Sequence, residues 1–275
     1  MKAVFNFMVV EMENISDNLD NRAFRYGDGL FETIIVQNKR ISFLKDHCER
    51  LLDGMNTLQM NVPAGFSLDY LQREIMQLCE LVGLPHDARL RLQVWRKPGG
   101  LYTPESNEID FLLTALPLTR PSISIKNRLI FYEDIRLHHS ILSPYKTSSA
   151  LPYVMAGIAR KNAGVDDVIL IDVYGHIAEC VASNIFWIKG NVLYTSGLES
   201  GCIAGIMRKN VLKEAALRFE KVKEGLFYKE TLLTADTVFT CNVAGIQLVK
   251  EINGVSFHTD TPLTDWFSWL LSGNQ

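Results

Sequence analysis

Three features of the sequence predict an α+β fold in two domains. In the first part of the chain, stretches with strand-like alternation are mixed with stretches of helical periodicity. The segment at 117–122 contains two prolines among polar neighbours, as linkers do. After it, short apolar runs follow one another closely, which is typical of antiparallel strands. We therefore predict a smaller N-terminal domain at 1–116, a linker at 117–122 and a larger C-terminal domain at 123–275.

The N-terminal domain contains two predicted helices. The run from Leu44 to Leu52 places Leu44, His47, Cys48 and Leu51 on one face. The run at 68–81 repeats apolar residues at the same helical spacing. Strands are predicted at the start of the chain and at 32–36, 89–95 and 110–115.

The C-terminal domain is predicted to contain an antiparallel meander. Its strands would lie at 168–172, 177–180, 184–188 and 192–195, because the turns between them are too short for parallel crossovers. A helix is predicted at 206–219, and strands return within 237–249.

The composition excludes several classes of protein. The 275 residues are 47% hydrophobic and 21% charged, with a net charge of −3, and carry no basic run interleaved with aromatic residues, so nucleic acid is not an expected partner. No stretch approaches the roughly 18 consecutive apolar residues of a membrane span. The six histidines lack the spacing of metal ligands, so no metal site is predicted. Reduced thiols in a cytoplasmic protein are expected from the five scattered cysteines Cys48, Cys79, Cys180, Cys202 and Cys241.

Lys146 and Glu179 are the candidate catalytic pair. A lysine amine can hold a carbonyl cofactor covalently, and a carboxylate can keep the ring nitrogen of that cofactor protonated. A third segment, Gly201 to Arg208, places a glycine before an amphipathic run, where the N-terminus of a helix can bind a phosphate. Arg50 could hold the same phosphate with two hydrogen bonds. Together these residues indicate pyridoxal 5′-phosphate (PLP) as the cofactor.

Other interpretations of these residues stay open. Glu179 could lie on the solvent face of the meander, and Arg50 could be a surface charge on its helix. Ser143 and Lys146 form an S-x-x-K pair, as in acyl-serine hydrolases, although the companion motifs of those enzymes and an export signal are not evident. A binding protein without a cofactor is a further alternative.

Several segments together resemble the class IV aminotransferase family of fold-type IV PLP enzymes. The run Tyr26 to Thr33 is similar to the N-terminal signature of the family, and His47 to Leu51 is similar to its phosphate-arginine helix. The stretch from Glu179 to Arg208 resembles its C-terminal signature. The resemblance covers nearly the whole chain. It implies the two-domain α+β fold of D-amino-acid aminotransferases, with PLP between the domains, and a homodimer.

The resemblance also implies roles for individual residues. Lys146 would be the Schiff-base lysine, and Glu179 would pair with the pyridine nitrogen. Ile203 would pack on the ring. The cofactor phosphate would be held by Arg50, by the backbone of Ile206 and Met207, and by Asn242 or Val243.

The residues around the motifs leave the reaction open. The run at 186–195 together with Cys241-Asn242 is most similar to aminodeoxychorismate lyases, which release 4-aminobenzoate and pyruvate for folate synthesis. Branched-chain aminotransferases carry a tyrosine at the position of Leu151, and D-amino-acid aminotransferases carry one at the substrate-binding position of Phe31. The lyases carry an arginine at the position of Leu101. The lyase is the first expectation, and an aminotransferase of the branched-chain or D-amino-acid type, with a 2-oxo acid acceptor, is the alternative.

Arg96 is the candidate for the substrate carboxylate. It ends a predicted strand just before Lys97-Pro98-Gly99-Gly100, where a guanidinium can project from the strand and bind a carboxylate with two hydrogen bonds. The alternative is that Arg96 lies in water at the end of an edge strand.

Overall fold

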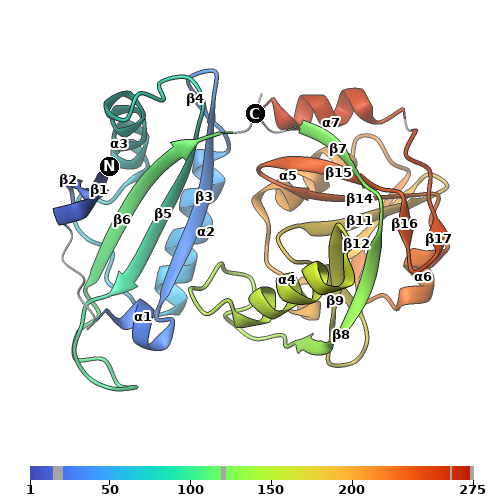
Figure 1. The fold of residues 1–275 in the computed structure, drawn as a ribbon, viewed down its shortest axis with the longest axis horizontal. Helices are drawn as coiled ribbons and strands as arrows, with labels where there is room; N and C mark the ends of the chain where they lie inside the picture. Colours follow the sequence, from blue (N-terminus) through green and yellow to red (C-terminus); the bar gives the residue numbers. More distant parts are fainter. Residues whose placement is uncertain (15–20, 119–121, 261, 273–275) are drawn as a thin grey trace. The chain divides into compact units, whose positions relative to one another are not determined.

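The computed structural model describes residues 1–14, 21–118, 122–260 and 262–272. The chain divides into two compact units, coloured along the sequence in Figure 1. The first unit comprises Met1–Arg120 and the short segment Tyr145–Ser149, and the second comprises Pro121–Pro144 and Ala150–Asn274. Of the linker predicted at 117–122, residues 119–121 lie outside the described residues.

The first unit is built on a six-stranded antiparallel sheet with the order β2-β1-β6-β5-β3-β4. The long strands β3, β5 and β6 form its centre and pair over nearly their whole length. The strands are β1 (Lys2–Phe5), β2 (Met8–Glu11), β3 (Gly29–Gln37), β4 (Arg40–Ile41), β5 (Ala88–Arg96) and β6 (Ile109–Pro117).

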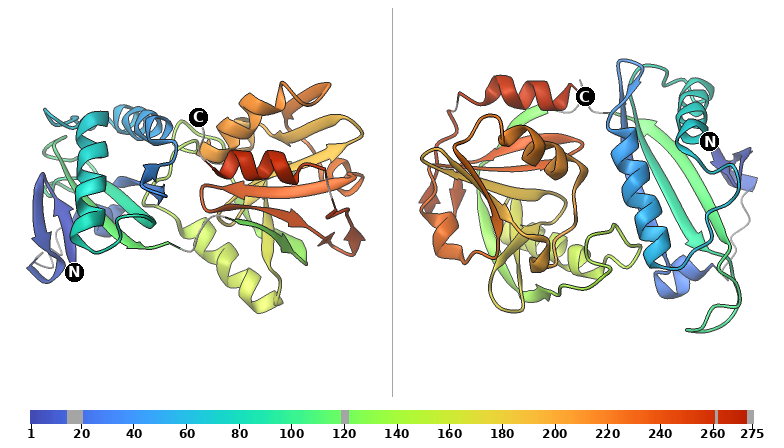
Figure 2. Two further views of the ribbon diagram at one scale, coloured as in Figure 1. Left: turned by 90° about the horizontal axis from the view of Figure 1, so that it is seen from above. Right: turned by 180° about the vertical axis from the view of Figure 1, so that it is seen from behind.

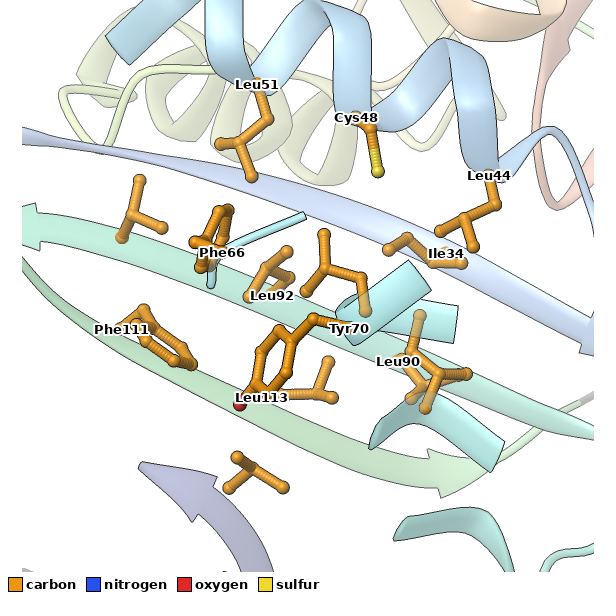
Figure 3. Packing of buried hydrophobic residues seen from close by; sticks show 14 of the residues in the cluster. Ile34, Leu44, Cys48, Leu51, Phe66, Tyr70, Leu90, Leu92, Phe111 and Leu113 are labelled. Atoms are coloured by element: carbon orange, nitrogen blue, oxygen red, sulfur yellow. The ribbon is translucent and has the colours of Figure 1, made fainter. Parts of the chain in front are cut away.

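Two amphipathic helices, α2 (Leu44–Thr57) and α3 (Leu68–Leu81), supply the apolar core of this unit. Figure 3 shows Leu44, Cys48 and Leu51 of α2 pointing onto the strands. The predicted helical face is confirmed, since all three side chains and that of His47 are buried. The short helix α1 (Arg22–Tyr26) and the 3-10 turn η1 (Met12–Asn14) complete the unit.

An aromatic cluster fills the part of this core under α3. The ring of Phe66 meets that of Phe111 edge-on at 5.1 Å between centroids, and Tyr70 lies 6.2 Å from Phe111 (Figure 3). Burial of each large apolar side chain contributes about 1.5–3 kcal/mol. This core therefore fixes the sheet that carries the candidate residues of the first unit.

The second unit contains two sheets. The five-stranded sheet has the order β10-β9-β8-β16-β17, and the six-stranded sheet has the order β13-β12-β11-β14-β15-β7. Both sheets mix parallel and antiparallel pairs. The strands are β7 (Ser122–Lys126), β8 (Leu129–Leu137), β9 (Asp167–Asp172), β10 (Ile177–Cys180), β11 (Asn184–Lys189), β12 (Val192–Ser196), β13 (Lys221–Gly225), β14 (Thr237–Asn242), β15 (Gly245–Val249), β16 (Glu251–Ile252) and β17 (Val255–Ser256).

Helices cover the sheets of the second unit. The helix α7 (Thr264–Leu271) lies beside β7 and β15, as both views of Figure 2 and the packing show. The helix α4 (Leu151–Ala163) packs on β8 and β9. The remaining helical segments are η2 (Leu198–Ser200), α5 (Ile206–Ala215) and α6 (Lys229–Leu233).

The predicted antiparallel meander is wrong in one respect. β9 pairs with β10 and β11 pairs with β12, both antiparallel as expected, but β10 and β11 belong to different sheets. The chain turns between them, where the amide of Cys180 donates to the carbonyl of Ser183 at 2.8 Å. β11 then pairs with β14 instead of β10. The helix predicted at 206–219 is also shorter, because α5 ends at Ala215.

Candidate functional site

The segment that carries Lys146 is held by β3 of the first unit. The amide of Phe31 donates to the carbonyl of Lys146 at 2.9 Å, and the amide of Ser148 donates to the carbonyl of Gly29 at 2.8 Å. Gly29 is required here, because a Cβ atom at this position would lie 2.6 Å from the carbonyl oxygen of Val94. This pairing explains why the segment groups with the first unit, although Lys146 falls within the C-terminal domain predicted at 123–275.

The aromatic ring of Phe31 is approached by two cations. The Nζ of Lys146 lies 5.0 Å from the ring centroid, and the guanidinium carbon of Arg91 lies 3.9 Å from it. The Nε of Arg91 also donates to Gln93 at 3.3 Å. Arg91 is exposed on β5, but partial desolvation of its guanidinium and the neighbouring charge of Arg89 lower its pKa. Arg91 was not identified from the sequence, although the alternation of β5 separates Arg89, Arg91 and Gln93 from the buried apolar residues of that strand.

Arg50 forms a buried ion pair with Glu32. Glu32 is 2% exposed and belongs to the row of β3 side chains that faces α2. The Nε of Arg50 donates to Oε1 of Glu32 at 2.8 Å, and the Nη2 donates to Oε2 at 2.5 Å. The Nδ1 of His47 lies 2.7 Å from Oε2 of Glu32. Burial would raise the pKa of Glu32, but the Arg50 charge and the hydrogen bonds from His47 and Arg50 outweigh it and lower the pKa to about 2.

Arg96 is a buried residue inside the sheet. Its strand, β5, lies between β3 and β6, so Arg96 does not end an edge strand, and it is 5% exposed. Its Nε donates to Asp28 at 3.0 Å, its Nη2 donates to the carbonyl of Leu58 at 2.6 Å, and its Nη1 donates to Asn107. A substrate carboxylate would have to replace one of these contacts.

Arg22 completes this cluster from α1. Its Nε donates to the same Asp28 oxygen at 2.8 Å. Its Nη1 donates to the carbonyls of Gly99 at 2.9 Å and Leu101 at 2.8 Å. Gly99 and Gly100 have φ angles of +119° and +73°, which residues other than glycine rarely adopt. Arg22 and Arg96 therefore fix the conformation of the loop after β5 through hydrogen bonds to its residues.

Glu179 lies in the second unit and is 3% exposed, so the alternative of a solvent-facing strand residue is wrong. Its Oε1 accepts the hydroxyl of Tyr153 at 2.6 Å and the amide of Ile203 at 3.0 Å, and its Oε2 accepts the side-chain amide of Asn184 at 3.2 Å. Burial raises the pKa of Tyr153, and the charge of Glu179 raises it further, so the phenol remains a donor. These donors come from three separate parts of the chain and hold the carboxylate in one orientation.

The start of α5 lies directly after this hydrogen-bonded group. Asn184 also donates to the carbonyl of Ile203 at 2.9 Å, and a Cβ atom on Gly205 would collide with the side-chain oxygen of Asn184. Gly205 precedes α5 and offers no capping side chain to Ile206 and Met207, the first residues of the helix. Backbone N–H groups at such a position can bind an anion.

Asn242 and Val243 lie at the turn between β14 and β15. The side-chain amide of Asn242 donates to the carbonyl of Ala182 at 2.9 Å, and its oxygen accepts the amide of Ala244 at 2.8 Å. Val243 is half-buried in the same turn. Asn242 thus ties this turn to the loop that connects β10 with β11.

The candidate residues are distributed over both units. Lys146, Phe31, Arg50 and Arg96 belong to the first unit, and Glu179, Ile203, Ile206, Met207, Asn242 and Val243 belong to the second. Ser143 of the S-x-x-K pair belongs to the second unit, where its hydroxyl donates to the carbonyl of Ser140 at 2.8 Å. Among the described residues, no helix is long and apolar enough to cross a membrane.

The chain belongs to the family "Amino-transferase class IV", whose pattern matches residues 29–252. It is 30% identical over 258 residues to a putative branched-chain-amino-acid aminotransferase of Methanocaldococcus jannaschii, covering 92% of this chain and 88% of that protein. It is 25% identical over 252 residues to the aminodeoxychorismate lyase of Vibrio harveyi, covering 89% of this chain and 90% of the lyase.

A solved structure confirms the predicted α+β fold. The branched-chain aminotransferase of Thermoproteus uzoniensis, solved with norvaline, aligns with a TM-score of 0.88 at 23% identity, over 100% of this chain and 96% of that one. Another branched-chain amino acid aminotransferase of this fold was solved with N-(5'-phosphopyridoxyl)-L-glutamate, a derivative of PLP. The protein is therefore an enzyme of the class IV aminotransferase family, whose members bind PLP. The homodimer and the cytoplasmic location stay predictions.

We expect the contribution of Glu32 to stability to depend on pH. Its folded pKa of about 2 lies below the unfolded value of 4.5, so its stabilisation is present above pH 4.5 and is lost as the pH falls towards 2. The pH-dependent part amounts to about 3 kcal/mol, at about 1.4 kcal/mol per pKa unit. Denaturant unfolding of the wild type and Glu32→Gln between pH 7 and 2.5 measures it. A difference between the two proteins that stays constant over this range would contradict the assignment.

Arg96→Ala should lower the free energy of unfolding by about 3–5 kcal/mol, because it removes one partner of a buried charge cluster. Arg89→Ala, at an exposed position of the same strand, should change it by less than about 0.5 kcal/mol. Urea unfolding curves compare the two variants. If Arg96→Ala unfolds like the wild type and only raises KM, the guanidinium binds the substrate carboxylate, as its position before Lys97-Pro98-Gly99-Gly100 predicts.

Proposed function

We propose that the protein is a PLP-dependent amino-acid aminotransferase that uses a 2-oxo acid as amino acceptor. The observation that carries this proposal is the arrangement of Lys146, Phe31 and Arg91, in which a guanidinium accompanies the candidate catalytic amine at one aromatic ring. Amino acids and 2-oxo acids all carry a carboxylate, and arginine binds carboxylates with two hydrogen bonds. The similarity to a putative branched-chain-amino-acid aminotransferase supports the same reaction.

The residues fit PLP in their chemistry. Hydrogen-bond donors favour the charged form of a carboxylate, and Glu179, which is buried and accepts such bonds, is the candidate to face a protonated ring nitrogen. The uncapped start of α5 offers the amides of Ile206 and Met207 to a phosphate. Arg50 offers a guanidinium for the same group, with Asn242 and Val243 as further candidates. Ile203, whose amide donates to Glu179, is the candidate for packing on the ring.

The cofactor, when bound, supplies an aldehyde for covalent attachment and a ring that accepts electrons from the substrate. We infer that Lys146 moves the substrate proton with its Nζ, since a partly buried lysine beside an aromatic ring can act as a general base. Glu179 holds a proton on the ring nitrogen and is kept in place by Tyr153, Ile203 and Asn184. Phe31 limits the movement of Lys146, and Arg91 orients the substrate through its carboxylate.

The lysis of aminodeoxychorismate to 4-aminobenzoate and pyruvate is the second candidate. The resemblance of the chain to the lyase of Vibrio harveyi favours it, as do the sequence features around 186–195. The position of Leu151 agrees with it as well, because branched-chain aminotransferases carry a tyrosine there. Both candidates use the same lysine and acid, so the substrate, the product and the need for an amino acceptor distinguish them.

Lys146→Ala should abolish turnover, because both the covalent attachment and the general base are lost. Reduction of the wild-type holoenzyme with borohydride, followed by peptide mapping, should find the cofactor on Lys146. Lys161→Ala, an exposed change on α4, is the matched control and should keep full activity. Cofactor on a different lysine would contradict the proposed site.

The product test separates the two reactions. The enzyme should transfer amino groups between an amino acid and a 2-oxo acid with ping-pong kinetics, because the amino group stays on the cofactor between the two half-reactions. Arg91→Met should raise KM for the acid substrate by about tenfold or more, the scale of a lost charge-assisted hydrogen bond of about 1.5–3 kcal/mol. Release of 4-aminobenzoate from aminodeoxychorismate without any acceptor, and no amino transfer, would establish the lyase instead.

A further inference from the structure

We propose that Glu32 and His47 are positioning residues that fix the guanidinium of Arg50 in the orientation that binds the cofactor phosphate. The inference rests on the proposed PLP function, in which Arg50 is a phosphate anchor. It assigns a role in cofactor binding to two buried side chains that would otherwise serve only the fold.

The burial of Glu32 indicates that its charge has a specific partner. It stands among Leu30, Ile34 and Val36 in the row of β3 that packs against α2, where an apolar side chain would contribute more to stability. A buried carboxylate costs several kcal/mol unless it is paired and hydrogen-bonded. Arg50 and His47 supply this pairing, and the pKa of Glu32 of about 2 means that it is ionised at neutral pH.

The geometry of the ion pair fixes the direction of Arg50. Two N–H groups of the guanidinium, at Nε and Nη2, meet the two oxygens of Glu32 in a parallel pair. A planar guanidinium held at two points cannot rotate about its last side-chain bonds, and little further entropy is lost when it binds an anion. The Arg50 side chain is only 10% exposed, so its surroundings also restrict it.

His47 fixes the carboxylate in turn. It lies one helical turn before Arg50 on α2, so both side chains reach the same glutamate. An ionised carboxylate only accepts hydrogen bonds, so the Nδ1 of His47 donates to Oε2 of Glu32. With Oε2 held by both residues, the carboxylate cannot turn away from the guanidinium.

A positioning role and a purely electrostatic role predict opposite results. Glu32 carries a negative charge close to the proposed site of an anion, so its neutralisation alone would tighten phosphate binding. Loss of orientation would weaken phosphate binding instead. The sign of the effect of Glu32→Gln therefore separates the two roles.

The experiment compares the affinities of the full-length, cofactor-stripped protein for PLP and for pyridoxal, which lacks the phosphate. Both bind through Lys146, so the ratio of the two dissociation constants reports the phosphate contacts alone. Glu32→Gln should reduce the preference for PLP by about tenfold, the scale observed when outer partners of metal ligands are removed. His47→Asn, which keeps the Glu32–Arg50 pair, should reduce it by a smaller factor. Pyridoxal binding should stay near the wild-type value in both.

The control variants separate this role from general damage. Glu74→Gln removes a different, largely buried carboxylate of the same unit and should leave the preference unchanged. In an Arg50→Ala background, Glu32→Gln should have no further effect on the preference, because Glu32 acts through Arg50. An unchanged or increased preference for PLP in Glu32→Gln would overturn the proposal, and His47→Asn decides by the same criterion if Glu32→Gln does not fold. If the wild type itself fails to prefer PLP over pyridoxal, the proposed function fails before this inference is reached.

Discussion

The candidate residues of the first unit depend on the ion pairs that the carboxylate of Asp28 forms. One of its oxygens accepts hydrogen bonds from two buried arginines, Arg22 of α1 and Arg96 of β5. Asp28 immediately precedes β3, so this cluster sets where the strand begins. The start of β3 then pairs with the segment that carries Lys146. On one face of this strand, the ring of Phe31 contacts Lys146 and Arg91. On the opposite face, the carboxylate of Glu32 accepts a hydrogen bond from Arg50.

Glu179 of the second unit is held in a different way. Asp28 and Glu32 are balanced by arginines, whereas the hydrogen bonds to Glu179 come from a phenol, a backbone amide and a side-chain amide. Neutral donors stabilise a buried carboxylate without cancelling its charge. The single orientation that these donors give to Glu179 suits an acid whose expected partner is a protonated ring nitrogen. The collision that a side chain at position 205 would cause with Asn184 shows how tightly this group is packed.

Local patterns in the sequence predicted the elements well, and long-range pairing limited the rest. The helical periodicity at 44–51 and 68–81 is a local property, and both helices form with the expected faces buried, except that Leu81 at the end of the second helix is exposed. The short turn at 181–183 predicts one sheet for the whole meander, and nothing in those residues indicates that β11 pairs with β14, about fifty residues later. The position of Arg96 inside the sheet is missed because β3, which pairs with β5 on the side opposite β6, lies far from Arg96 in sequence. Candidate residues such as Lys146 and Glu179 came from motifs, whereas the partners Tyr153, Asn184 and Arg91 carry no motif and depend on the folded chain.

The pairing of Tyr145–Ser149 with β3 also determines how this polypeptide can be divided. The segment lies between two stretches that belong to the second unit, so the first unit is discontinuous in sequence. A protein cut at residue 120 would separate Gly29 and Phe31 from their hydrogen-bonding partners and expose the unpaired edge of a strand, which favours aggregation. The two units consequently cannot be exchanged with those of a relative by a single crossover in the gene, because the recombinant would take its lysine from one parent and the strand that holds it from the other.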